Sequence, residues 1–218
     1  MKKMSVGVKH KALYLILFFA TLGLDIGAGY LLPVNLATFY WLYPSVETIC
    51  FLIIIYLAIR MGAFEEFVKK LRIKSFLFIV FFILLGIFLS ALGKTLYFHL
   101  SAPLDYVWSN QGNVNNLQMI IPHWYGLFLL FLAGPIMEEI AFRFYIFRFF
   151  KHQWLGFIIS ILAFTYIHSG FSLVAFYYAG AGIAFGLAYW RRKSVFESIL
   201  VHIGMNLLLS FIVLPILW

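Results

Sequence analysis

Residues 135–147 read PIMEEIAFRFYIF, an apolar and aromatic run interrupted by three ionisable side chains, Glu138, Glu139 and Arg143. The surrounding sequence is apolar enough to form a membrane span near 122–147. An ionised side chain at the centre of a bilayer costs roughly 2.5–3.5 kcal/mol on insertion scales. We therefore expect the three charges to face the interior of a helical bundle and to serve a purpose that offsets this cost.

The composition is that of a membrane protein. The 218 residues are 64% hydrophobic and 21% aromatic, and only 11% are charged, whereas soluble domains carry about 25% charged residues. The mean hydropathy is +0.99. The single Cys50 excludes a disulfide framework and a cysteine-rich metal site. The predicted fold class is all-α, a polytopic transmembrane helical bundle of about seven spans, within a range of six to eight.

Apolar runs between polar breaks predict where these spans lie. The candidates are near 12–33, 40–59, 75–98, 122–147, 153–169, 172–190 and 195–217. The basic leader MKKMSVGVKHK precedes a run long enough to span, so we expect an uncleaved first helix. Residues 60–74 are expected to form a charged loop, and residues 99–121 the longest polar connection. We interpret residues 1–218 as a single membrane domain.

The basic residues predict the orientation. Of the 16 Lys and Arg residues, all except Lys94 fall on one side of the membrane if the N-terminus is cytoplasmic. Basic loops that face anionic lipid headgroups account for the net charge of +8. The bilayer is therefore the expected partner, nucleic acid is not, and the oligomeric state is left open.

The first polar cluster is Glu138-Glu139-x-x-x-Arg143. Positions 139 and 143 are one helical turn apart, so Glu139 and Arg143 are expected to pair on one face. Glu138 is rotated by about 100° and is left to point into a cavity, where it suits a general base. Gly134-Pro135, just before it, is expected to kink the helix.

Two further clusters contain histidine. Phe164 and His168 lie one turn apart in the fifth span, and His202 and Asn206 in the seventh. Each has an ordinary structural explanation: His168 as a residue near a span end, and the His202–Asn206 pair as hydrogen-bonding contacts between helices. Asp25 and Glu47, in the first two spans, are most simply structural as well.

Taken together, the clusters predict a hydrolytic site. Glu138 would take the proton of a water that His168 helps to orient, and His202 and Asn206 would donate hydrogen bonds to an oxyanion. Ideal helices place Glu138, His168 and His202 about 15, 20 and 12 Å from the cytoplasmic helix ends. Because His168 is the deepest, we expect the fifth span to be tilted or interrupted.

The order E-E-x-x-x-R, F-x-x-x-H and H-x-x-x-N, each in a span, resembles the CAAX protease and bacteriocin-processing family of intramembrane proteases, which includes the type II CAAX prenyl endopeptidases. The likeness covers residues 122–210, and residues 1–121 carry no recognisable signature. One departure is visible, because Phe144 stands where many members have glycine after the arginine. The segment FGLAYWRRKSVFESILVHIGMN resembles the family's approach to its last motif.

The resemblance implies hydrolysis of a peptide bond in a membrane-associated peptide or protein, in a bundle that opens toward the cytoplasm. It implies Glu138 as the activator of water, the Glu139–Arg143 pair as support, and His168, His202 and Asn206 as the remainder of the site. In a bacterial cell membrane, maturation of a signalling peptide or bacteriocin leader, or self-immunity, fits better than processing of prenylated proteins.

Two alternatives concern the chemistry and the activity. Glu138, His168 and His202 could together ligate zinc, but no H-E-x-x-H motif is present and Asn206 suits an oxyanion better than a metal. We therefore expect no cofactor. A non-proteolytic immunity or scaffold protein should tolerate loss of Glu138, and a transporter should show inverted repeats, which the sequence lacks.

Overall fold

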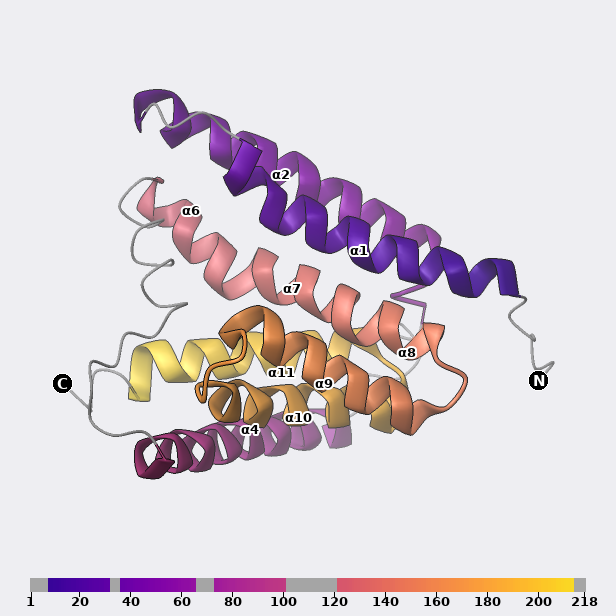
Figure 1. Cartoon of the computed structure of the whole chain (residues 1–218), viewed down its shortest axis with the longest axis vertical. Helices are drawn as coiled ribbons and strands as arrows, with labels where there is room; N and C mark the ends of the chain where they lie inside the picture. The colour runs from indigo at the N-terminus through magenta and orange to yellow at the C-terminus, as the bar shows by residue number, and fades with distance from the viewer. Residues whose placement is uncertain (1–7, 32–35, 66–72, 101–120, 214–218) are drawn as a thin grey trace.

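The computed structural model describes residues 8–31, 36–65, 73–100 and 121–213. Most of the expected polar connection at 99–121, and part of the charged loop at 60–74, lie outside these residues. The described residues are helical and contain no strand, so the predicted all-α fold class is confirmed. Figure 1 shows the fourth span between the two N-terminal helices on one side and the remaining helices on the other.

The N-terminal pair consists of α1 (Val8–Leu31) and α2 (Leu36–Arg60). Pro44, which the sequence suggests as a flank of the first connection, lies inside α2. A proline removes one backbone donor, and membrane helices tolerate this where Ser or Thr side chains satisfy nearby carbonyls. Ser45 donates to Trp41 O (2.9 Å), and Thr48 donates to Pro44 O (2.6 Å).

The third span, α4 (Ile73–Leu100), packs against α10 (Ala175–Arg192) with very close backbones. A Cβ atom on Gly93 would lie 2.1 Å from Phe176 O, and one on Gly180 would lie 2.5 Å from Ser90 N. Small residues at such crossings let membrane helices approach each other closely. The Ser90 hydroxyl adds a hydrogen bond to Tyr177 O at 3.1 Å.

The fourth span is continuous but irregular. It runs through α6 (His123–Phe128), the π-helical segment η1 (Leu129–Ala133), α7 (Gly134–Glu139), a second π-helical segment η2 (Ile140–Tyr145) and α8 (Ile146–Phe149). The π-helical segment η1 ends directly before Gly134-Pro135, the position at which the sequence predicts a kink. Single π-helical turns inside α-helices occur frequently at functional sites.

The last three spans are α9 (Gln153–Ser169), α10 and α11 (Val195–Leu208), and α11 continues into η3 (Leu209–Val213). Three helices are long and apolar enough to cross a membrane by length and composition, namely Tyr40–Arg60, Ser75–Leu100 and His123–Phe149. The segments Gln153–Ser169 and Val195–Phe211 are shorter and also apolar. The protein is therefore a membrane helical bundle, and its fourth span lies at the centre (Figure 1).

Candidate active site

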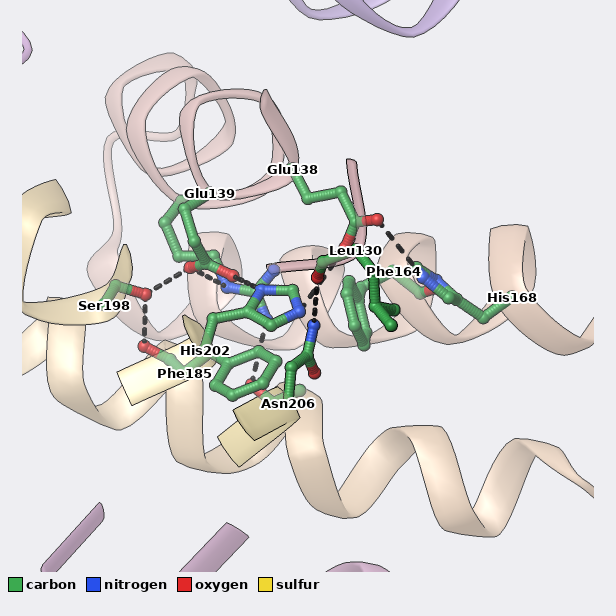
Figure 2. A network of polar contacts seen from close by, with 11 residues as sticks. Leu130, Glu138, Glu139, Phe164, His168, Phe185, Ser198, His202 and Asn206 are labelled. Atoms are coloured by element: carbon green, nitrogen blue, oxygen red, sulfur yellow. Dashed lines mark hydrogen bonds and ion pairs between the residues drawn. The ribbon is translucent and has the colours of Figure 1, made fainter. Parts of the chain in front are cut away.

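Three helices bring Glu138, His168 and His202 to one point (Figure 2). The Glu138 carboxylate, on α7, lies 3.5 Å from His168 Nε2 on α9 and 3.9 Å from His202 Nε2 on α11. Its side chain is 21% exposed. One carboxylate oxygen is buried and makes no hydrogen bond with the described residues. The carboxylate thus faces two imidazoles while retaining unused hydrogen-bonding capacity.

A backbone carbonyl holds His168 in place. His168 Nδ1 lies 2.8 Å from Phe164 O, and the imidazole packs against the Phe164 ring with centroids 4.2 Å apart. A carbonyl only accepts hydrogen bonds, so Nδ1 must carry the proton. In the neutral ring, Nε2 is then an acceptor directed at the Glu138 side of the site.

Glu139 holds His202 in the same way. His202 Nδ1 lies 3.0 Å from the Glu139 carboxylate, and the imidazole stacks on Phe185 with centroids 4.2 Å apart. The carboxylate fixes the proton on Nδ1, so Nε2 again points toward Glu138. His202 Nε2 therefore donates a hydrogen bond to an oxyanion only when the ring is protonated.

Glu139 is the centre of a buried polar network, in which Arg143 Nε and Nη1 make no hydrogen bond with the described residues. Arg143 Nε lies 3.2 Å from one Glu139 oxygen, which also accepts a hydrogen bond from Ser198 Oγ, and both ionic side chains are 0% exposed. Arg143 Nη2 donates to Gly182 O at 3.3 Å. The predicted Glu139–Arg143 contact is therefore present. The adjacent His202 contact shows that Glu139 also orients part of the site.

Aromatic rings surround the buried guanidinium. The Arg143 Cζ atom lies 4.7 Å from the Phe164 ring centroid and 5.4 Å from that of Phe185. Cation–π contacts of this kind contribute most where the cation is desolvated. Phe164 thus packs against both His168 and Arg143, and its position one turn before the histidine allows both contacts.

Asn206 links α11 to the π-helical segment η1. Its Nδ2 donates a hydrogen bond to Leu130 O at 3.0 Å. An amide nitrogen carries two hydrogens, so one remains for an oxyanion. The position is compatible with the expected donor role, and the contact also ties the last span to the irregular part of the fourth.

The fifth span is not interrupted, and the irregular helix is the fourth span. The sequence suggests a tilted or interrupted fifth span, because ideal helices leave His168 deeper than its partners. The fifth span, α9, runs to Ser169 without a break in its helical assignment. The irregular segments lie instead in the fourth span, where η1 and η2 flank the α7 helix that carries Glu138 and Glu139.

Ser198 was not singled out from the sequence. Its hydroxyl contacts Glu139 and also lies 3.0 Å from Phe185 O. The available signal is spacing, because Ser198, His202 and Asn206 recur every four residues and so share one face of α11.

Two acidic residues of the N-terminal pair also approach the site. Asp25 lies close enough to Glu138 and His168 to interact with them electrostatically, and Glu47 to interact with Asp25. Glu47 is 1% exposed, and one of its oxygens makes no hydrogen bond with the described residues. The first two spans therefore contribute ionisable side chains to the surroundings of a site whose sequence motifs all lie in the last four.

Zinc binding is the alternative that the sequence leaves open. Within the described ranges, no group of three His, Cys, Asp or Glu side chains is arranged to hold a metal ion. The two histidine Nε2 atoms and Glu138 remain the residues to which a zinc ion would bind.

Known proteins similar to this chain indicate the family to which it belongs. Residues 120–208 match the family described as type II CAAX prenyl endopeptidase Rce1-like. The chain is 34% identical over 166 residues to the UPF0177 protein YbdI of Lactococcus lactis subsp. lactis (strain IL1403), covering 76% of this chain and 92% of that protein. It is 34% identical over 170 residues to YbdJ of the same strain, covering 78% and 75%. No solved structure matches the chain.

A further relative is the UPF0177 protein in the abiGi 5' region of Lactococcus lactis subsp. cremoris, 27% identical over 178 residues, covering 81% of this chain and 75% of that protein. The extent of the match to YbdI, together with the matched family and the three motifs in order, establishes the relationship. The chain belongs to the CAAX protease and bacteriocin-processing family, with the UPF0177 proteins of Lactococcus among its relatives.

Proposed function

We propose that this protein is an intramembrane endopeptidase that hydrolyses a peptide bond in a membrane-associated peptide or protein. Membership of a family related to the CAAX prenyl endopeptidases supports a protease of this type. One observation carries the proposal: a partly exposed glutamate faces the Nε2 atoms of two histidines from two other helices. The N-terminus is proposed to lie in the cytoplasm of a bacterial cell.

The proposed chemistry begins at Glu138. Its carboxylate takes a proton from a water, and the water oxygen attacks the scissile carbonyl carbon. When the carbon–nitrogen bond breaks, the leaving amine takes the proton back from Glu138. His168 Nε2, 3.5 Å from the carboxylate, orients the water as an acceptor. No covalent enzyme intermediate is required.

Charge on the tetrahedral intermediate requires donors. The second amide hydrogen of Asn206 is available, since the first is bonded to Leu130 O. His202 supplies another through Nε2 when both ring nitrogens carry a proton, and Glu139 at 3.0 Å from Nδ1 holds the ring in this orientation. Preorganised donors of this type typically contribute about 10²–10³-fold in rate each.

The test is cleavage of fluorogenic apolar peptides by the full-length protein in detergent or lipid nanodiscs. Wild type is compared with Glu138→Gln and His202→Ala, and with Glu65→Gln, which removes an exposed carboxylate far along the chain from the motifs. Cleavage that persists in Glu65→Gln and is lost in the other two supports the proposal. Equal cleavage by all four proteins contradicts it.

A chelator arm separates the metal-free and zinc-dependent versions. We propose the metal-free version, in which cleavage is insensitive to chelation. Loss of cleavage with chelator, restored by added zinc, would instead assign Glu138, His168 and His202 as ligands. A biological function that survives Glu138→Gln would favour the non-proteolytic immunity or scaffold alternative.

A further inference from the structure

An apolar groove runs along the outside of the bundle between α1, the end of the fourth span and α9. It has a volume of about 170 Å³. Its exposed or half-buried walls are Leu15, Phe19, Phe149, Phe150, Ile159 and Ala163. A cavity of about 150 Å³ lined by apolar side chains holds a benzene-sized molecule. The groove is therefore large enough for several carbons of a hydrocarbon chain.

Cations flank one end of this groove. Lys11 lies one helical turn before Leu15 on α1, Arg148 lies within the last turn of the fourth span, and Lys151 directly follows Phe150. Arg148 and Lys151 are exposed, and the Arg148 guanidinium also lies 4.7 Å from the centroid of the Phe144 ring. Across the described part of the chain, no carboxylate forms an ion pair with any of the three. The groove thus combines an apolar interior with an uncompensated basic end.

We propose that this groove binds an acyl chain of an anionic phospholipid whose headgroup is held by Lys11, Arg148 and Lys151. The charge pattern selects the ligand: an apolar chain satisfies the walls, and only a headgroup with net negative charge gains from the three cations. The acyl chain of a zwitterionic lipid fits the same groove, but its headgroup lacks the net electrostatic attraction to the three cations. The site is independent of the proposed catalytic activity.

The groove lies directly behind the candidate active site. Phe18, which also lines it, contacts the Phe142 ring with centroids 5.8 Å apart. Phe142 contacts Phe164 at 5.5 Å, and Phe164 packs against His168 at 4.2 Å. An acyl chain bound in the groove would cover the contact between α1 and the π-helical segment η2. Lipid binding is therefore expected to raise the thermal stability of the bundle.

The test is lipid binding by the full-length protein, delipidated in neutral detergent. Dioleoylphosphatidylglycerol and dioleoylphosphatidylcholine are titrated separately, and bound lipid is counted by native mass spectrometry. Wild type is expected to hold one phosphatidylglycerol more tightly than phosphatidylcholine. Each cation removed, in Lys11→Gln, Arg148→Gln and Lys151→Gln, is expected to reduce that preference by about fivefold.

Two further variants test the position of the site. Ala163→Phe fills the groove and is expected to remove the bound lipid of either kind. Lys193→Gln removes an exposed cation that follows α10, outside the groove, and is expected to leave the preference unchanged. Equal affinity of wild type for the two lipids, or a preference that survives loss of all three cations, would overturn the proposal. If Ala163→Phe is poorly folded, the charge variants decide the question alone.

Discussion

Two neighbouring carboxylates, Glu138 and Glu139, occupy opposite kinds of environment. Glu139 is 0% exposed, and each of its oxygens has a partner among Arg143, His202 and Ser198. Glu138 is 21% exposed, faces two imidazoles at 3.5 and 3.9 Å, and has an oxygen that makes no hydrogen bond with the described residues. One carboxylate is enclosed by the fold, and the other is left available to a ligand.

The difference follows from a helical rotation of about 100° between adjacent residues. It places Glu139 against α11, which carries Ser198 and His202, and turns Glu138 toward the end of α9. Removing one partner of a buried ion pair is strongly destabilising, because the other charge is left buried without compensation. A charge with free capacity is more readily explained by chemistry. The comparison therefore assigns support to Glu139 and reactivity to Glu138.

The largest expected effect is on catalysis by Glu138→Gln. Loss of a general base typically costs about 10²–10⁴-fold in rate, so we expect cleavage to fall by that factor. Because Glu138 is partly exposed and its contacts with the two imidazoles, at 3.5 and 3.9 Å, are longer than those of Glu139, we expect only a small loss of stability. The measurements are the cleavage rate and the thermal unfolding midpoint of the same preparation. If Glu138→Gln unfolds at a markedly lower temperature than wild type, Glu138 also supports the fold, and the proposed difference between Glu138 and Glu139 is wrong.

Glu139→Gln is expected to show the converse pattern. Removing one partner of a buried ion pair leaves Arg143 uncompensated, at a cost of about 3–5 kcal/mol in the free energy of unfolding. Denaturant titration in mixed micelles measures this loss. The matched control is Glu197→Gln, which breaks a buried carboxylate's ion pairs with Arg191 (2.7 Å) and Arg192 (2.9 Å) outside the site. Because Arg191 and Arg192 are partly exposed, that control should lose less stability.

Asn206→Ala tests the oxyanion donor that α11 is proposed to contribute to the site. It removes the hydrogen bond to Leu130 O and the remaining amide hydrogen proposed for the oxyanion. Loss of one oxyanion donor typically costs about 10²–10³-fold in kcat. We expect kcat to fall in this range while KM changes little, as steady-state kinetics would show. A change confined to KM would mean that Asn206 serves substrate binding or helix packing instead.

The sequence predicted the helical bundle and the Glu139–Arg143 contact because both follow from local rules. Hydropathy defines spans, and a spacing of four residues places Glu139 beside Arg143 and His202 beside Asn206. It did not predict the π-helical segments η1 and η2, since these depend on how the fourth span packs against its neighbours. The approach of Asp25 to Glu138 is likewise a tertiary contact between distant segments, and no local pattern specifies it.

The smallest expected effect concerns Ser198, the hydroxyl that completes the network around Glu139. Thr and Val have nearly the same shape: both add one methyl group to the serine side chain, and Val carries a second methyl group where Thr keeps the hydroxyl. Because Arg143 and His202 still hold Glu139, the Val variant should be less stable than the Thr variant by only about 1 kcal/mol. If Ser198 acts by positioning Glu139 and thereby His202, kcat should fall several-fold in the Val variant, with KM unchanged and the Thr variant close to wild type. If the two variants lose activity equally, the hydroxyl has no positioning role and the space around residue 198 is what matters.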